Sequence, residues 1–391
     1  MQGTALLVAA ATLLYGWAFT KEISRSGELE HPRFSTAFHP GPETPLYAER
    51  FITAPLGGPG MIHSPSICET KSGNLVAAWY GGSREGATDV AVYGSTLESG
   101  KDNQWSEPRR IVDADSASRE LRRYVRKVGN SVVFSGKDGP LWLLYVSIAV
   151  GGWSGSSLNV KSSSDDGVTW TPSTRLTLSP FFNVSELVRS RPLSLESGGF
   201  AVPIYHELLG QFCEILWLLP DGSAPETVRW TKTRMTDGKE FIQPSIAPLD
   251  DLSAVALYRT VVPGPRLAGF AGSADGGLHW NAPRRASLLN PGSSLSVLTL
   301  SGGRLLVAFN DTRQDRENLR LAVSTDLGET WTNLATLEAE NGKEFSYPYM
   351  IRDREGLIHL VYSWQRERVK HVSFNEAWID ARLREATPEG R

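Results

Sequence analysis

The chain has 391 residues, of which 40% are hydrophobic and 21% charged, so it can bury a core and is neither disordered nor fibrous. Its 40 Lys and Arg residues against 43 Asp and Glu residues give a formal net charge of -3, which argues against a nucleic-acid partner. Two cysteines, seven scattered histidines and the lack of a glycine-rich phosphate loop exclude a disulfide scaffold and argue against a metal or nucleotide cofactor. We therefore expect a folded globular protein that works without a cofactor, with two or three domains from the length alone.

The first predicted element is an apolar segment at the N-terminus. Residues 1–20 carry no charged side chain, and residues 5–19 are almost wholly apolar. This length lies between a signal-peptide core and a full membrane span, for which roughly 20 residues are needed. Because a basic start and a good cleavage site are both missing, we favour an uncleaved membrane anchor over a removed signal peptide, with a buried helix of the main domain as the alternative. We expect a hydrophobic helix over 1–20, a linker over 21–46 and the main domain over 47–391.

Three eight-residue segments repeat along the main domain. They follow the pattern S-x-D-x-G-x-[T/H]-W around Asp165, Asp275 and Asp326. The gaps between these aspartates are 110 and 51 residues, so we expect a degenerate copy in the first gap, near Asp221 and Gly222. In such a segment the Asp accepts hydrogen bonds from the backbone ahead of it, the Gly supplies a positive φ and the Trp packs back onto the turn. The pattern is typical of a tight turn between antiparallel strands.

The flanks of these turns read as short strands rich in apolar residues. Examples are residues 141–146, 304–309 and 319–324. A period of about 50 residues holds four short strands, which is the content of one propeller blade. The sequence therefore predicts an all-β fold, a six-bladed β-propeller over residues 47–391. An array of independent β domains is the alternative, but no single unit of it could bury both of its faces.

The three segments resemble the Asp boxes of the sialidase (neuraminidase) superfamily and of the wider BNR-repeat proteins. The resemblance covers about residues 47–375, and residues 79–86 (WYGGSREG) and 347–348 make the chain most similar to the bacterial BNR-repeat, sialidase-like branch. Such boxes are specific for the fold and weak for function, because non-enzymatic propellers also contain them. The resemblance implies a site in the central channel, with an arginine triad for the sugar carboxylate, a Tyr nucleophile with a Glu partner, and an Asp acid/base.

The resemblance assigns the nucleophile to Tyr347. Residues 347–350 (YPYM), followed by Gly356, are similar to the family's Tyr-Ser-x-Leu strand and its downstream turn glycine. The anomeric carbon of a sialic acid carries a carboxylate, so a neutral phenol approaches it with less repulsion than a carboxylate nucleophile does. A nearby base must then take the phenol proton, because a tyrosine of pKa about 10 is a weak nucleophile when protonated. The alternative is that Tyr347 is a packed strand aromatic.

Two arginines match carboxylate-binding positions of the family. Arg259 closes the apolar run 254–257, as the second family arginine closes its strand, and burying it without an anionic partner would be costly. Arg316 runs into the strand before the third repeat, as the third family arginine does. Since Arg313 and Arg320 lie close by in the sequence, an exposed loop arginine is the alternative for Arg316.

Two positions depart from the family pattern. The family's first arginine is replaced by His63, and a neutral imidazole holds a carboxylate less well than a guanidinium does. The family's Glu falls near Gln243, which cannot act as a base, so Glu207 is the first replacement and Glu240 the second, unless these are surface carboxylates. The departures leave room for a substrate other than an ordinary sialic acid.

Residues 84–89 (REGATD) are similar to the family's segment of an arginine followed by a loop aspartate. Arg84 is then a substrate-binding residue, and Asp89 has the acid/base spacing of some relatives. Glu85 is better placed if Asp89 already begins the next strand. Gly81, Gly82 and Gly86 predict a mobile loop here, where a proton donor could sit beside the leaving oxygen. A salt bridge between Arg84 and one of these acids is the alternative.

Together these residues predict a sialidase-like exo-glycoside hydrolase that removes a terminal α-linked acidic sugar from a glycan or glycoconjugate. The alternatives are a hydrolase or lyase acting on another acidic or neutral sugar, and a non-catalytic carbohydrate-binding propeller. Such glycans lie outside the cell or in its envelope, so we expect an exported or envelope protein whose N-terminal segment binds the membrane. Cys68 and Cys213 leave room for one disulfide bond.

Overall fold

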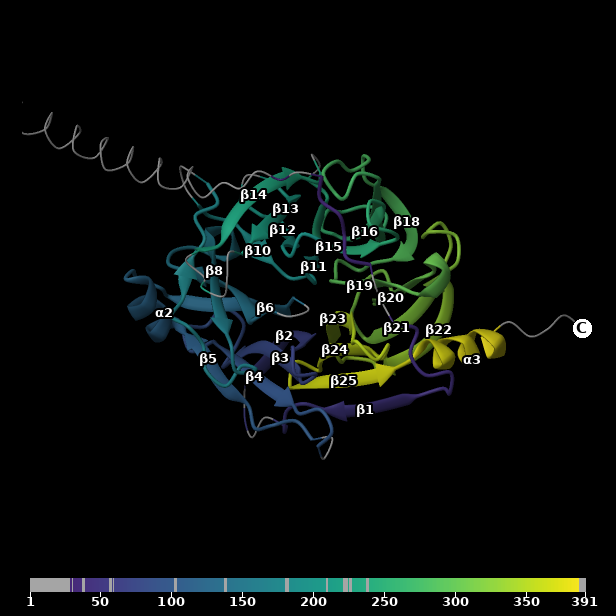
Figure 1. Ribbon diagram of the computed structural model, residues 1–391, viewed down its shortest axis with the longest axis horizontal. Helices are drawn as coiled ribbons and strands as arrows, with labels where there is room; N and C mark the ends of the chain where they lie inside the picture. The colour runs from purple at the N-terminus through teal and green to yellow at the C-terminus, as the bar shows by residue number, and fades with distance from the viewer. Residues whose placement is uncertain are drawn as a thin grey trace, which may run out of the picture.

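Six antiparallel sheets form a ring around a central axis in the computed structural model (Figure 1). The structure describes residues 29–386 except 30, 37–38, 56–57, 59, 102–103, 137–138, 180–182, 209, 221–223, 225–226 and 237–238. The predicted six-bladed, all-β propeller is therefore confirmed, and one ring replaces the two or three domains that the length suggested. The predicted hydrophobic helix over 1–20 lies outside the described residues.

Each sheet is one blade, with its innermost strand at the central axis and three further strands outward. The innermost strands are β2 (Met61–Glu69), β6 (Lys127–Ser135), β10 (Leu187–Val188) with β11 (Leu193–Ser194), β15 (Phe241–Pro248), β19 (Ser296–Thr299) and β23 (Phe345–Arg352). The second strands are β3 (Leu75–Gly82), β7 (Leu141–Ile148), β12 (Phe200–His206), β16 (Ala254–Thr260), β20 (Leu305–Phe309) and β24 (Ile358–Trp364). The third strands are β4 (Ala91–Leu97), β8 (Ser156–Ser163), β13 (Phe212–Leu219), β17 (Leu267–Ser273), β21 (Asn318–Ser324) and β25 (Arg368–Phe374). The outermost strands are β5 (Arg109–Asp113), β9 (Thr174–Arg175), β14 (Arg229–Arg234), β18 (Arg284–Leu289), β22 (Thr332–Ala339) and β1 (Tyr47–Phe51).

The blades are numbered 1 to 6 in the order of their innermost strands along the chain, from β2 to β23. Blade 6 combines the first and the last strand of the propeller. Its outermost strand β1 comes from the N-terminal side and pairs antiparallel with β25, with Tyr47 opposite Phe374. Helix α3 (Glu376–Ala386) follows β25, and its Trp378 stacks on Tyr47 with ring centroids 4.9 Å apart. The other described α-helix, α2 (Ala114–Leu121), connects blades 1 and 2. Pairing the first strand with the last closes the ring and covers the outer edge of β25, which would otherwise be unpaired.

The three repeated segments lie between the third and fourth strands of blades 2, 4 and 5. In blade 2 the Asp165 carboxylate accepts hydrogen bonds from the backbone N–H (2.8 Å) and the hydroxyl (2.6 Å) of Thr169. Gly167 has a φ of 85°, and its carbonyl accepts a hydrogen bond from the Trp170 indole. Asp275 and Asp326 accept the equivalent N–H contacts. The expected degenerate copy at residues 221–222 lies outside the described residues.

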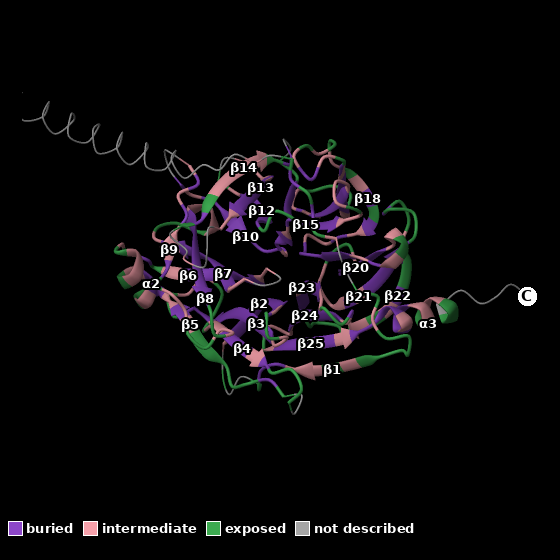
Figure 2. Ribbon diagram, in the orientation of Figure 1, coloured by how far each residue is buried: buried purple, intermediate pink, exposed green. Residues whose placement is uncertain are grey.

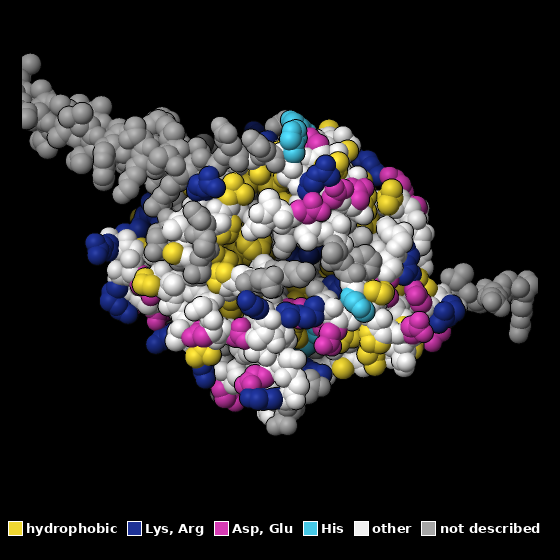
Figure 3. All heavy atoms as spheres, in the orientation of Figure 1, with side chains coloured by type: hydrophobic (Ala, Val, Ile, Leu, Met, Phe, Trp, Pro, Cys, Tyr) yellow, Lys and Arg dark blue, Asp and Glu magenta, His cyan; other side chains and the backbone are white. Residues whose placement is uncertain are grey.

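Apolar side chains fill the space between the blades. Figure 2 shows the buried residues on the inner strands and the exposed ones mainly on outer strands, loops and helices. The three strands predicted over 141–146, 304–309 and 319–324 are confirmed as β7, β20 and β21. Cys68 and Cys213 are both buried and unpaired, so the disulfide bond that the sequence allowed is not formed. Figure 3 shows acidic and basic side chains interspersed on the face in view, in keeping with the near balance of charge.

A β-bulge interrupts the innermost strand in four blades. The register with the second strand shifts between His63 and Ser66, Gly129 and Val132, Ile242 and Ser245, and Ser346 and Tyr349. Each bulge holds one non-glycine residue with a positive φ, namely Ser64 (53°), Asn130 (39°), Gln243 (52°) and Tyr347 (56°). Non-glycine residues rarely adopt this conformation, and bulges of this kind often redirect side chains beside active sites. The bulges therefore mark the inner strands at the level of the predicted site.

The described part of the expected linker 21–46, called the arm below, lies against one end of the ring. The Phe34 backbone bonds to Asp251 and forms a β-bridge with Leu195, and the Pro32 carbonyl lies against Gly276. Figure 1 traces this arm from the border of blades 3 and 4 towards β1. The segments that it touches are turns between first and second or third and fourth strands. This is the end of the ring opposite to the loops that follow the second strands.

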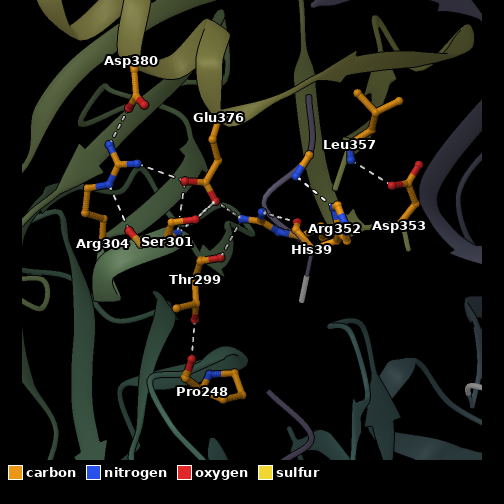
Figure 4. A network of polar contacts seen from close by, with 11 residues as sticks. His39, Pro248, Thr299, Ser301, Arg304, Arg352, Asp353, Leu357, Glu376 and Asp380 are labelled. Carbon is orange, nitrogen blue, oxygen red and sulfur yellow. Dashed lines mark hydrogen bonds and ion pairs between the residues drawn. The ribbon is translucent and has the colours of Figure 1, made fainter. Parts of the chain in front are cut away.

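Ion pairs of Glu376 connect helix α3 to blades 5 and 6, and Arg352 also contacts the arm. Arg352 donates to the His39 carbonyl (3.4 Å) and to the Glu376 carboxylate (2.5 Å), and Arg304 donates to the other Glu376 oxygen (3.0 Å) (Figure 4). Ser301 also donates to Glu376 from its backbone N–H. Among the described residues, none of the helices is both long and apolar enough to span a membrane.

Candidate active site

Four of the predicted site residues, each from a different blade, meet at the end of the ring that carries the loops after the second strands. His63 lies in the bulge of β2, Arg259 at the end of β16, Arg316 in the loop before β21, and Tyr347 in the bulge of β23. Arg316 and Arg259 both lie close enough to His63 to act on its charge. The sequence-predicted nucleophile and carboxylate-binding residues therefore share one site.

Tyr347 is partly exposed and in contact with three site residues. Its ring meets the ring of His63 edge to face, with centroids 4.6 Å apart. The guanidinium of Arg316 lies 5.5 Å from the Tyr347 ring centroid, and that of Arg189 lies 5.2 Å from it. Cations at these distances interact favourably with an aromatic ring. The phenol is thus held between two arginines and an imidazole.

His63 is fully buried, and neither of its ring nitrogens has a hydrogen-bond partner within the described part of the chain. Burial, together with the positive charges of Arg366, Arg316, Arg189 and Arg259, lowers the pKa of His63 well below its usual value. The imidazole is therefore neutral at physiological pH. Its Nε2 lies 4.0 Å from the nearer carboxylate oxygen of Glu344.

Glu344 connects two arginines at this site. It accepts hydrogen bonds from Arg316 Nη1 (3.1 Å) and from the Ser346 hydroxyl (2.6 Å), with a longer contact from Arg366 Nη1 (3.4 Å). Burial works in the opposite direction, but these contacts lower the pKa of Glu344. Arg366 also donates to Glu85 (2.6 Å). A chain of alternating charges therefore runs from the loop of blade 1 through blade 6 to blade 5.

Gln243 links Arg259 to an interior tyrosine. Its side-chain oxygen accepts from Arg259 Nη1 (3.4 Å), and its nitrogen donates to the Tyr205 hydroxyl (3.1 Å). Asn130 donates to the same hydroxyl (3.2 Å). The 3.4 Å contact is long for a hydrogen bond, and Arg259 Nε is buried without a hydrogen-bond partner among the described residues. Arg259 thus retains donor capacity for a ligand.

Glu207 directly follows β12, the second strand of blade 3. Burial raises the pKa of the Glu207 carboxyl, and the charge of Arg259 opposes the shift. A carboxyl group with a raised pKa can accept or donate a proton near neutral pH. The second choice, Glu240, is half exposed and paired with Arg285 of β18 (2.7 Å).

The loop of blade 1 carries the three remaining predicted residues. Asp89 accepts hydrogen bonds from the backbone N–H and the hydroxyl of Ser83 (both 2.9 Å), and it precedes β4 by two residues. Arg84 is exposed in the same loop. Of the three, Glu85 is connected to the site, because it pairs with Arg366, which also contacts Glu344. The ion pair of Glu85 is therefore made with blade 6, and not with Arg84 as the alternative interpretation had it.

Arg189 is a site residue that sequence reasoning missed. It leaves β10 in blade 3 and reaches blade 6 across the axis, where its Nη2 donates to the carbonyls of Tyr347 (2.6 Å) and Pro348 (3.3 Å). The side chain is buried, which lowers the pKa of Arg189 to about 10. Its Nε and Nη1 have no hydrogen-bond partner among the described residues. Through these two hydrogen bonds Arg189 stabilises the backbone of Tyr347 at its positive φ.

Glu344 and Arg366 were also missed. Glu344 lies three residues before Tyr347, and its carboxylate could have been considered from that spacing alone. Arg366 lies in the turn after β24, outside the motifs that the sequence resemblance rests on. Within the described residues, no group of three or more His, Cys, Asp or Glu side chains could hold a metal ion.

Comparison with known proteins gives one family and a set of similar folds. A family model described as a BNR repeat-like domain matches residues 73–360. The Hadza microbial sialidase Hz136 superposes with a TM-score of 0.65 at 16% identity over 80% of this chain, which spans 65% of that structure. The NanB sialidase of Streptococcus pneumoniae gives a TM-score of 0.63 at 11% identity, covering 83% of this chain and 70% of NanB. An α-L-arabinofuranosidase of Fusarium graminearum gives 0.55 at 12% identity, covering 80% of this chain and 92% of the enzyme.

A search of curated proteins found no match. Because the identities to these solved structures are so low, the superpositions establish likeness of fold alone.

Proposed function

The chain belongs to the BNR repeat-like family, and from its site we propose that it is a sialidase-like exo-glycoside hydrolase that removes a terminal α-linked acidic sugar. The observation that carries the proposal is the meeting of Tyr347, Arg316, Arg259 and His63 at one end of the channel. Two sialidases among the similar folds support the same class of activity. Similarity of fold would not be enough without these residues, because unrelated functions share one fold and function depends on the site.

In the proposed reaction the arginines hold the sugar carboxylate and Tyr347 attacks the anomeric carbon. A bond forms between the phenol oxygen and this carbon while the bond to the leaving oxygen breaks. Glu207, on the Arg259 side of the site, accepts the phenol proton. Glu85 or Asp89 gives a proton to the leaving oxygen, and water then cleaves the tyrosyl-sugar bond. Of the two acids, Glu85 is better placed, because Arg366 connects it to the site.

A kinetic assay tests this proposal. Hydrolysis of a fluorogenic α-sialoside and of related nonulosonate glycosides is measured for the wild type, Tyr347→Phe and Tyr47→Phe. Losing the nucleophilic oxygen is expected to lower turnover by on the order of 10³-fold or more. Tyr47 lies on β1, the outermost strand of the same blade, so Tyr47→Phe is expected to keep wild-type turnover. The proposal fails if no acidic glycoside is hydrolysed, or if Tyr347→Phe is as active as the wild type.

A hydrolase or lyase of another sugar, including a neutral one, is the second candidate. Glu344 already lies between Arg316 and Arg366, and His63 stands where the family has an arginine, so part of the positive charge is used within the protein. The arabinofuranosidase among the similar folds acts on a neutral sugar. Turnover of neutral glycosides alone in a glycan panel would select this candidate. Glycan binding without any turnover, unaffected by Glu207→Gln, would instead indicate a non-catalytic binding propeller.

We also propose that the propeller over residues 47–391 acts outside the cytoplasm, held at the membrane by residues 1–20 through the segment 21–46. The support is the nature of the substrate, because terminal acidic sugars occur on extracellular and envelope glycans. Cleavage of the propeller by an added protease in intact cells tests this location. Full protection that ends only when the cells are lysed would contradict it.

A further inference from the structure

Arg366 lies close to His63, the residue that stands where the family has an arginine. Arg366 lies in the β24–β25 turn with a φ of 60°, and its carbonyl accepts a hydrogen bond from the backbone N–H of Ile62 (2.6 Å). Ile62 directly precedes His63, so the turn of blade 6 is tied to the bulge of blade 1. Arg366 therefore starts from the backbone next to the position where the family carries its first arginine.

Arg366 is also accessible to a ligand, unlike the other arginine that the sequence analysis missed. Its side chain is 30% exposed and that of Arg316 is 22% exposed, whereas Arg189 is 2% exposed beneath Tyr347. A carboxylate that enters from solvent can meet Arg366 and Arg316 directly.

The spacing between Arg366 and Arg316 suits a carboxylate. One oxygen of Glu344 contacts Arg316 Nη1 at 3.1 Å and the other contacts Arg366 Nη1 at 3.4 Å. A single carboxylate of the protein thus bridges the two guanidinium groups. The Arg366 contact is beyond the usual hydrogen-bond distance, so this nitrogen is weakly engaged and can turn to a second carboxylate.

From this placement we infer that Arg366 joins Arg316 and Arg259 to bind the carboxylate of an acidic sugar, in place of the family arginine that His63 replaces. The inference rests on the proposed function, because it names a further binding residue of the same site. Glu85 holds Arg366 from the other side (2.6 Å) and orients it.

The charges at the site also favour a single anionic group. The four guanidinium groups around His63 are those of Arg366, Arg316, Arg189 and Arg259. Glu85 and Glu344 pair with Arg366 and Arg316, whereas none of the described carboxylates lies within ion-pair distance of Arg189 or Arg259. An incoming carboxylate would offset the remaining positive charge, which a neutral sugar cannot do.

A binding experiment tests the inference without requiring turnover. Calorimetry measures the affinity of 2-deoxy-2,3-didehydro-N-acetylneuraminic acid and of its methyl ester for the wild type, Arg366→Ala and Arg366→Lys. We expect Arg366→Ala to weaken binding of the acid by about 10- to 100-fold and to leave binding of the ester within twofold. Arg366→Lys keeps the charge that Glu85 pairs with but loses the fork geometry, so we expect a smaller loss.

Arg368→Ala is the matched control. Arg368 lies two residues away, donates to the Thr53 carbonyl and stacks on Phe51, so its loss is expected to leave both affinities unchanged. The inference is overturned if the wild type does not bind the acid, or if both Arg366 variants bind it as tightly as the wild type. It is also overturned if Arg366→Ala weakens the acid and the ester equally.

The proposed hydrolase activity and the carboxylate-binding role of Arg366 can each fail without the other. Acid binding that depends on Arg366 in a protein that hydrolyses no glycoside would contradict the proposed activity and support this inference. Sialoside hydrolysis that is unaffected by Arg366→Ala would support the activity and contradict this inference.

Discussion

At the scale of single residues, the site is built from contacts between blades that are far apart in the sequence. Arg189 of blade 3 supports Tyr347 of blade 6, and Arg366 of blade 6 pairs with Glu85 of blade 1. Tyr347, Arg259 and Arg316 could be predicted because they lie on strands or strand ends whose pattern resembles a family. Arg189 and Arg366 could not, because their roles depend on which residues the closed ring places opposite them.

Glu186, which directly precedes β10 in blade 3, gives a prediction on stability. Its side chain is almost fully buried and its Oε2 has no hydrogen-bond partner among the described residues, so burial raises the pKa of Glu186 to about 7. Since the folded state then binds a proton more tightly than the unfolded state, stability falls as the pH rises from about 4.5 to about 7. Above that range, burial of the ionised carboxylate lowers the free energy of unfolding by roughly 3 kcal/mol.

Replacing this carboxyl removes the penalty. We expect Glu186→Gln to gain stability over the wild type as the pH rises from 5 to 8, by up to roughly 3 kcal/mol in denaturant unfolding. Glu98→Gln, at an exposed position, serves as the control and is expected to show a much smaller change with pH. A difference between Glu186→Gln and the wild type that is the same at both pH values would contradict the prediction.

At the scale of elements, the turns were predictable and the bulges were not. Asp, Gly and Trp at fixed spacing marked three turns between third and fourth strands, because each residue has a distinct task there. The bulges place Ser64, Gln243 and Tyr347 at positive φ, a conformation for which these residue types carry no sequence signal. The orientation of Gln243 and Tyr347 therefore depends on β-bulges that could not be predicted from the sequence.

The turn of blade 4 gives a prediction about the arm. Gly276 has a φ of 74°, and a Cβ there would overlap the carbonyl oxygen of Pro32. Gly302 has nearly the same φ (72°) but no atom near the place of a Cβ. We expect Gly302→Ala to cost about 1 kcal/mol, from backbone strain alone. Gly276→Ala should cost roughly 2 kcal/mol or more and make residues 31–46 easier to cleave by protease. Equal costs and equal cleavage would show that the arm does not pack here.

At the scale of the whole molecule, the repeat period predicted the number of blades but not how the ring closes. Strand β1 completes blade 6 by pairing with β25, so its five residues hold the two ends of the chain together. The length had suggested two or three domains, whereas a closed ring buries the faces of every blade against its neighbours. A site at the axis then depends on all blades at once.

This dependence can be measured by truncation. A chain that begins at residue 29 keeps β1, whereas one that begins at residue 52 lacks it and exposes the edge of β25. We expect the first to unfold in one cooperative transition and the second to lose cooperativity or aggregate, because an unpaired edge strand invites association. Equal midpoints and equal slopes in urea for the two chains would contradict the closure by β1.

The proposed reaction requires Tyr347 to form a covalent bond to an acidic sugar at the channel, and this bond can be trapped. A sialosyl fluoride with a second fluorine on the adjacent carbon loses fluoride as the phenol oxygen bonds to the anomeric carbon, and the second fluorine slows hydrolysis of the product. We predict one added sugar on the peptide that contains Tyr347, found by mass spectrometry after digestion, and none in Tyr347→Phe. A protein that gains no sugar, or gains it on another residue, would contradict the proposed reaction.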